Sequence, residues 1–147
     1  MIPRLTQSPQ VSPAVERYIH ALNESGFTGD TTTRYGDRLT LATDNSIYQL
    51  LPQAIVFPRS TADVILVMRL AAQDEFRSVT FTPRGGGTGT NGQSLNNGVV
   101  IDLSRYMNRI LEINPEQGWV RAEAGVIKDQ LNAYLKPYGY FFAPELS

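Results

Sequence analysis

Five of the eight residues from Gly85 to Gly92 are glycine, within the stretch T-P-R-G-G-G-T-G-T-N-G-Q-S. Clustered glycines allow the backbone to take positive φ and to come close to a ligand. Successive N–H groups in such a turn form an anion-binding nest, which suits a diphosphate. Arg84 could supply charge or brace the loop, and three hydroxyl groups could add donors: those of Thr88, Thr90 and Ser94.

Two other phosphate-binding loops fit this stretch poorly. Gly87 to Gly92 matches G-x-G-x-x-G, but the Rossmann turn continues into a helix, and the residues here continue as Q-S-L-N-N-G-V-V-I-D-L, which begins none. A Walker loop needs a lysine, and none lies between Gly85 and Asn97. A mobile surface loop is the weaker alternative, because ordering five glycines in a compact domain is entropically costly.

The elements before the glycines predict a βαβ unit. Residues 54–57 (A-I-V-F) form a short buried strand that Pro58 stops. Ser60 and Asp63 form a capping arrangement that begins a helix extending to about Phe76, with apolar residues on most of its sides. We therefore expect this helix to be largely buried. Residues 79–82 form a second strand, parallel to the first, which runs into the glycines.

The flanking segments have a different pattern. Downstream we expect a strand at 98–104 and a hairpin that pairs 109–113 with 119–124. A helix should follow from about Val126 to Tyr138. The chain then enters a strand-like apolar run, Y-F-F-A-P, which indicates that the domain continues further. The helix should turn four side chains inward: Ile127, Leu131, Tyr134 and Leu135. Upstream, Ser12-Pro13 begins a helix that Gly26 ends, with an inward stripe of Val15, Tyr18, Ile19 and Leu22. The first ten residues are expected to be an untethered arm and residues 28–51 irregular.

Composition excludes several classes of function. The chain has 147 residues and a net charge of −1 without runs of like charge, so nothing favours nucleic acid or an anionic membrane as a partner. It contains no cysteine, which excludes disulfides, thiolate zinc sites and iron–sulfur clusters within it. No apolar run approaches the roughly 20 residues of a membrane span, and no hydrophobic signal segment is present, so we expect a cytoplasmic protein. His20, the single histidine, is expected to be a solvated surface residue.

The joint pattern resembles a known family. P-R-G-G-G-T-G-x-x-G-x-S is similar to the glycine loop of FAD-linked oxidoreductases of the vanillyl-alcohol oxidase and p-cresol methylhydroxylase type. The similarity extends upstream through D-N-S-I-Y-Q-L-L-P-Q-A-I-V-F-P and downstream through G-V-V-I-D-L-S-R-Y-M-N-R-I and W-V-R-A-E-A-G-V, over roughly Asp44 to Glu145. It looks closest to the D-2-hydroxy-acid dehydrogenases for D-lactate, glycolate and D-2-hydroxyglutarate. The R-Y-G-D-R-L-T-L-A-T-D-N-S-I-Y segment is most similar to large bacterial proteins that fuse the flavin module to an iron–sulfur segment.

The resemblance implies an α+β chain with the p-cresol methylhydroxylase-type FAD-binding fold. Its first subdomain would be the βαβ unit, followed by the start of a second subdomain with an antiparallel sheet, and the fold would be truncated at the chain's end. Residues 1–43 would be an N-terminal arm and helix leading into the flavin domain. Residues 44–147 would be the N-terminal part of the FAD-binding domain, with its remainder and the substrate domain absent.

The resemblance also implies which residues contact FAD. The implied set is Val56, Pro58, Arg84, Gly85, Gly86, Gly87, Thr88, Gly89, Asn91, Gly92, Ser94 and Pro144. Relatives that attach flavin covalently can carry a histidine in this loop; Thr88 stands here instead, so FAD is expected to be non-covalent. Many relatives have Asn where Gly87 stands, which removes one side-chain donor. If the glycines adopt positive φ, valine at Gly86 or Gly89 should abolish FAD retention without unfolding the chain.

For the full-length protein, the resemblance implies oxidation of a 2-hydroxy acid to a 2-oxo acid by hydride transfer to flavin N5, with a separate electron acceptor. An iron–sulfur cluster could lie beyond this chain, and the protein could associate peripherally with the inner membrane face. No residue here is a catalytic or metal-binding candidate; Asp102, Glu112, Arg121 and Glu123 belong to strand faces and turns. Alditol or sugar-lactone oxidases, the reductase of cell-wall precursor synthesis and a cofactor-free binding module remain alternatives. The oligomeric state is not indicated.

Overall fold

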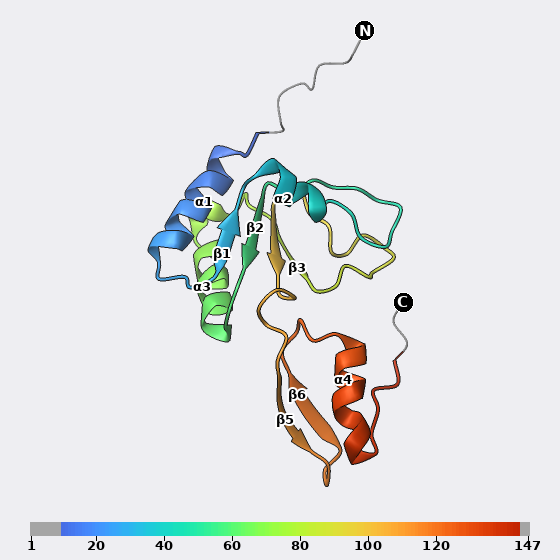
Figure 1. Cartoon of the computed structure of the whole chain (residues 1–147). Helices are drawn as coiled ribbons and strands as arrows, with labels where there is room; N and C mark the ends of the chain where they lie inside the picture. The colour runs from blue at the N-terminus through green and yellow to red at the C-terminus, as the bar shows by residue number, and fades with distance from the viewer. Residues whose placement is uncertain (1–9, 145–147) are drawn as a thin grey trace.

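The computed structural model describes residues 10–144. Apart from Gln10, the expected N-terminal arm lies outside these residues. The elements fall into a lobe built on a four-stranded sheet and a smaller lobe built on a two-stranded hairpin, which we call the hairpin lobe (residues 109–144) (Figure 1). No helix within residues 10–144 is long and apolar enough to cross a bilayer.

The first helix, α1 (Pro13–Glu24), forms as its sequence predicts. The Ser12 hydroxyl accepts a hydrogen bond from the backbone N–H of Val15 at 3.4 Å, and Gly26 takes φ 85° just beyond the helix. The inward stripe is confirmed, because four residues of α1 are buried in the core: Val15, Tyr18, Ile19 and Leu22. The Tyr18 hydroxyl donates to the Val67 carbonyl at 2.9 Å, which joins α1 to α3 (Thr61–Ala71).

The main sheet has the order β1-β2-β4-β3, which corrects the expected pairing. The strands are β1 (Asp30–Thr32), β2 (Ala54–Phe57), β3 (Phe81–Arg84) and β4 (Val99–Asp102). Both β2 and β3 run parallel to β4, which lies between them, so the two strands of the βαβ unit do not pair with each other. The strand after the glycines therefore belongs to the first sheet, where all four of its residues are buried.

Helix α3 and the segment before β2 also differ from expectation. Ser60 and Asp63 cap α3 as predicted, but the helix ends at Ala71, a 3-10 turn, η1 (Asp74–Phe76), follows, and only Asp63 and Val67 are buried. The prediction of a largely buried helix is wrong, because only one side of α3 packs against α1 and the sheet. Within residues 28–51, expected to be irregular, the chain forms β1, antiparallel to β2, and α2 (Tyr35–Thr40).

The hairpin is confirmed in the second lobe. Strands β5 (Ile110–Asn114) and β6 (Trp119–Ala122) pair antiparallel across a turn in which Gly118 has φ 68°. Helix α4 (Lys128–Leu135) and the 3-10 turn η2 (Lys136–Tyr138) follow. Leu135 is buried and Leu131 half-buried, whereas Ile127 and Tyr134 are exposed, so their expected inward orientation is wrong. Residues 140–144 form no strand.

Candidate functional site

The glycine loop (residues 85–92) leaves the carboxyl end of β3, the sheet edge where parallel α/β sheets bind ligands. All of residues 85–98 are described, and none of them is helical before the chain enters β4. The interpretation against a Rossmann turn is therefore confirmed. The loop is positioned at its start by Leu103, whose N–H donates to the Arg84 carbonyl at 2.9 Å.

Two of the loop glycines are required by backbone conformation. Gly87 has φ 68° and Gly92 has φ 74°, in the left-handed region that other residues rarely adopt. A Cβ at Gly92 would lie 3.0 Å from the Tyr48 ring, and one at Gly89 would lie 2.1 Å from the amide of Gln93. Gly86 and Gly89 do not have positive φ, so the expectation that valine is excluded from these two positions by positive φ is wrong.

Within the described part of the chain, neither backbone conformation nor crowding requires glycine at Gly85 or Gly86. An added Cβ would meet nothing closer than 3.9 Å at Gly85 and 3.6 Å at Gly86, and neither residue has positive φ. Both line a cleft of about 610 Å³. Glycine at these two positions fits a site where a bound group approaches the backbone closely. The cleft's lining residues are Gly85, Gly86, Thr88, Ser104, Asn108, Ala124, Gly125, Val126, Ile127, Lys128, Asp129 and Gln130.

Arg84 braces the loop from below. Its side chain is only 8% exposed; its Nη2 donates to the Thr43 carbonyl at 2.9 Å and its Nη1 to the Ser94 hydroxyl at 3.4 Å. The Ser94 hydroxyl in turn donates to Asp44 at 3.0 Å. Of the two roles considered for Arg84, the structure therefore gives it the bracing role. Ser94 is buried in the same network.

The D-N-S-I-Y segment is the second support of the loop, which residue patterns alone did not identify. Asp44 accepts from the Ser46 N–H at 2.9 Å, and the Ser46 hydroxyl accepts from the Tyr48 N–H at 3.1 Å, so two side-chain turns follow each other. The Asn45 N–H donates to the Gly87 carbonyl at 3.1 Å. A hydrogen bond from the Ser46 side chain is the largest influence lowering the pKa of the Asp44 carboxyl, and the backbone N–H of Ser46 lowers it further.

The opposite wall of the cleft comes from the 103–108 turn and the start of α4. The Gly125 N–H donates to the Met107 carbonyl at 2.8 Å, and a Cβ at Gly125 would come within 2.3 Å of the Leu103 carbonyl oxygen. This close contact brings the segment after β6 to the glycine loop. The first turn of α4 lines the cleft, and no side chain caps this helix end, so its N–H groups favour an anion there.

The implied FAD contacts lie in three places. Gly85, Gly86 and Thr88 line the cleft, whereas Gly87, Gly89, Asn91 and Gly92 continue the loop, and the Asn91 N–H donates to Gln93. Val56 and Pro58 are fully buried around the end of β2, and Pro144 is exposed at the last described position; none of these three lines the cleft. Sequence reasoning missed Ser104, Asn108 and the 124–130 segment as cleft residues.

The residues considered unsuited to catalysis have structural partners or lie at the surface. Glu112 pairs with Arg121 across the hairpin at 3.2 Å, and Glu123 binds the Arg109 guanidinium at 2.7 Å. Asp102 accepts from the backbone and hydroxyl of Ser104 where β4 ends. His20 is exposed on α1.

Solved structures share this fold. The chain aligns with alkyldihydroxyacetonephosphate synthase at a TM-score of 0.72 and 21% identity, over 90% of this chain and 28% of that one. It aligns with p-cresol methylhydroxylase at a TM-score of 0.65 and 19% identity, over 86% of this chain and 24% of that one. The class is therefore the p-cresol methylhydroxylase-type FAD-binding fold, of which the chain covers a part.

The family follows from the sequence comparisons. The model of the family described as "FAD binding domain" matches residues 52–147, and the chain belongs to this family. A D-2-hydroxyglutarate dehydrogenase of Escherichia coli (strain K12) is 69% identical over 100% of this chain and 14% of that protein. A mitochondrial cytochrome-type D-lactate dehydrogenase of Kluyveromyces lactis is 33% identical over 62% of this chain and 16% of that protein. The chain thus spans about one seventh of the length of its most similar relative named here.

Proposed function

We propose that the cleft holds the diphosphate of FAD. The observation that carries the proposal is the open space over Gly85 and Gly86, whose lack of a side chain is not explained by positive φ or by crowding from residues 10–144. Gly85, Gly86, Thr88 and the uncapped first turn of α4 line the cleft, and the backbone N–H groups of such a loop and helix end suit a doubly charged group. The side chains of Arg84 and Ser94 support the loop from beneath, and the backbone of both residues would take part in the diphosphate contact.

The remaining implied contacts complete the proposed set. Gly87, Gly89, Asn91 and Gly92 would continue the diphosphate contact, and Pro144 would approach from the end of the hairpin lobe. Val56 and Pro58 would contribute through the backbone around the end of β2, because their side chains are buried. With Thr88 and no histidine in the glycine loop, FAD is held here without a covalent bond.

We further propose that the chain is the N-terminal flavin-binding part of a larger D-2-hydroxyglutarate dehydrogenase. The support is the 69% identity over the whole chain to a protein of that name. Bound FAD supplies the acceptor for the hydride that leaves the α-carbon of the 2-hydroxy acid. This chain's residues bind and orient the cofactor, while substrate-binding and acid–base groups would come from the rest of the protein.

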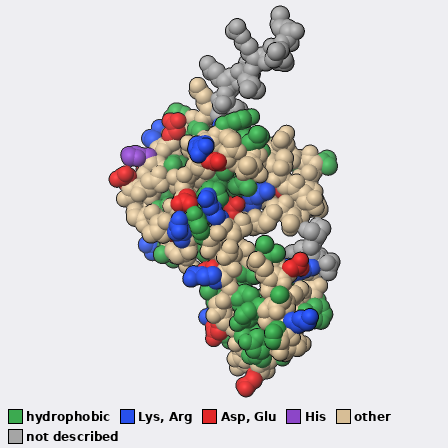
Figure 2. Space-filling view, viewed as in Figure 1, with side chains coloured by type: hydrophobic (Ala, Val, Ile, Leu, Met, Phe, Trp, Pro, Cys, Tyr) green, Lys and Arg blue, Asp and Glu red, His purple; other side chains and the backbone are tan. Residues whose placement is uncertain are grey.

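The exposed surface of the hairpin lobe supports a larger flavin domain. Figure 2 shows hydrophobic side chains gathered on this lobe, and its large exposed residues include Leu111, Trp119, Phe141 and Phe142. A two-stranded sheet is marginally stable by itself, and apolar patches of this kind usually mark contact surfaces. Further strands of the same protein would cover them.

Three finer features belong to the same proposal and rest on the resemblance. They are an iron–sulfur cluster in the part of the protein that this chain does not include, a separate electron acceptor, and a cytoplasmic location that allows peripheral contact with the inner membrane face.

The proposal is tested on the purified full-length protein under anaerobic conditions. We expect a flavin absorption band that D-2-hydroxyglutarate bleaches, while L-2-hydroxyglutarate and D-lactate bleach it much more slowly. If the flavin is bleached only by another hydroxy acid or by a sugar alcohol, the proposed substrate is wrong and the proposed cofactor is supported. A colourless protein that takes up no FAD would overturn both and favour a cofactor-free module.

A further inference from the structure

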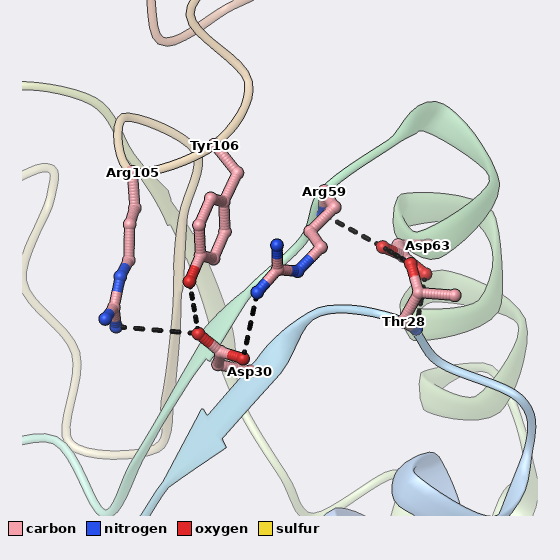
Figure 3. A network of polar contacts seen from close by, with 6 residues as sticks. All are labelled: Thr28, Asp30, Arg59, Asp63, Arg105 and Tyr106. Carbon is pink, nitrogen blue, oxygen red and sulfur yellow. Dashed lines mark hydrogen bonds and ion pairs between the residues drawn. The ribbon is translucent and has the colours of Figure 1, made fainter.

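Asp30 joins the start of the sheet to the 103–108 turn (Figure 3). Its carboxylate accepts a hydrogen bond from the Tyr106 hydroxyl and a 3.4 Å hydrogen bond from Arg59 Nη2. Arg105 Nη1 lies 3.9 Å from the same carboxylate. The single carboxylate thus binds groups from the end of β2 and from the turn that follows β4.

Cation–π contacts also join Arg59 and Arg105 to aromatic rings of this network. The Arg59 guanidinium lies 4.0 Å from the centre of the Tyr106 ring, and the Arg105 guanidinium lies 4.6 Å from that of Phe57. The backbone of Arg59 is also held in place, because its main-chain N–H donates to the Asp63 carboxylate, which also accepts from Thr28 (Figure 3). Tyr106 therefore meets a carboxylate and a cation whose positions the sheet and α3 determine.

The turn held by this network is one wall of the cleft. Ser104 and Asn108 line it, and the Asn108 amide donates to the Ser104 carbonyl at 3.1 Å. The Leu103 and Met107 carbonyls face Gly125, which brings the start of α4 to the cleft. Displacement of Tyr106 and Arg105 would move this wall relative to the glycine loop, although neither residue lines the cleft.

We infer that Asp30 is a positioning residue for cofactor binding, acting through Tyr106 and Arg105 on the 103–108 turn; the inference rests on the proposed FAD site. Asp30 lies before residues 52–147, the range that matches the family model, so this support is added by the N-terminal segment. The hydrogen bond from Tyr106 is also the largest influence lowering the pKa of the Asp30 carboxyl.

The test uses the full-length protein after its flavin has been removed. Asp30→Asn removes the charge, and Tyr106→Phe removes only the hydroxyl while keeping the ring beneath Arg59. The matched control is Asp74→Asn, which breaks an exposed 2.9 Å ion pair with Arg77 away from the cleft. For each variant the dissociation constant of FAD is measured well below the melting temperature, together with amide hydrogen exchange of residues 103–108 in the absence of FAD.

We expect the dissociation constant to rise by about tenfold in Asp30→Asn and Tyr106→Phe and to stay unchanged in Asp74→Asn. A lowered melting temperature with unchanged FAD affinity would mean that the network is only structural and would overturn the inference. If the unaltered protein binds no FAD, the proposed function fails, and hydrogen exchange decides this inference separately. Faster exchange at 103–108 in Asp30→Asn then supports the positioning role, and unchanged exchange overturns it.

Discussion

The guanidinium of Arg84 lies directly against Gly87: a Cβ at Gly87 would stand 2.3 Å from Arg84 Nη2. The glycine loop thus rests on a buried cation that Thr43 and Ser94 hold in place. The loop's glycines consequently have different roles. At Gly87 the Arg84 side chain beneath the loop leaves no room for a Cβ. At Gly85 and Gly86 the group that the cleft is proposed to hold would require glycine.

Replacing Arg84 by Met should destabilise the chain and loosen the loop. The variant loses charge-assisted hydrogen bonds to Thr43 and Ser94 in a buried site, so we expect the unfolding free energy to fall by about 1.5–3 kcal/mol. Urea unfolding measures this change. Arg77→Met is the control, because Arg77 is exposed and forms its ion pair with Asp74 at the surface. Equal stability of the two variants would contradict the bracing role of Arg84.

Alanine at Gly87 and at Gly118 should separate backbone strain from crowding. Both glycines have φ 68°, but a Cβ at Gly118 meets nothing within 4 Å. We expect Gly118→Ala to reduce the unfolding free energy by about 1–2 kcal/mol from strain alone. Gly87→Ala should cost more, because Arg84 must also move. A smaller loss at Gly87 than at Gly118 is incompatible with the Arg84 contact.

Local sequence patterns predicted the elements that form from neighbouring residues or from a periodic apolar face. The stripe and cap of α1 and the N-P-E-Q-G hairpin are encoded within a few turns or a few residues. By contrast, β1 has three residues and α2 six, too few for a periodic signal. β1 is recognisable only through its pairing with β2. The place of β4 between β2 and β3 is likewise a property of the whole sheet.

The candidate site was predictable on one side only. Five glycines lie within the eight residues 85–92, so the local composition marked the loop. The opposite wall depends on Gly125 packing against the 103–108 turn, a contact between segments that no spacing rule connects. Burial of Arg84 also could not be read from its type, because arginine is mostly exposed in proteins. The Asx-turn spacing of Asp44 and Ser46 was the one available signal for the second support.

The Asp63→Asn substitution should make the unfolding free energy of the chain depend less on pH in the acid range. Burial alone would raise the pKa of the Asp63 carboxyl, but hydrogen bonds from Thr28, Arg59 and Ser60 outweigh burial and lower it. A carboxyl with a lowered folded pKa adds stability above its unfolded value of about 3.9, and that stability is lost as the pH falls through the folded value.

Urea unfolding between pH 7 and pH 3 measures the effect of Asp63. We expect Asp63→Asn to be less stable than the unaltered chain at pH 7 by about 1–3 kcal/mol, with the difference shrinking below pH 4. Asp74→Asn, at an exposed ion pair, serves as the control. A difference that stays constant over the whole pH range would contradict the assignment.

Gly125→Ala should weaken FAD binding by moving the hairpin lobe. The added Cβ would lie 2.3 Å from the Leu103 carbonyl oxygen and 2.7 Å from that of Met107, and these backbone atoms cannot yield easily. We expect the start of α4 to shift away from the glycine loop and FAD affinity to fall by about tenfold or more. Fluorescence titration with FAD measures this loss. Unchanged affinity would show that the 124–130 segment is not part of the site.

The most direct test of the FAD site is the FAD affinity of Gly86→Val in the full-length protein, measured beside its melting temperature. Gly86 lines the cleft, and a Cβ added there meets nothing closer than 3.6 Å, so we expect affinity to fall by about a hundredfold with the apoprotein's melting temperature unchanged. Gly36→Val, at an open glycine outside the cleft, is the control and should bind FAD normally. Normal FAD binding by Gly86→Val would contradict the proposed site.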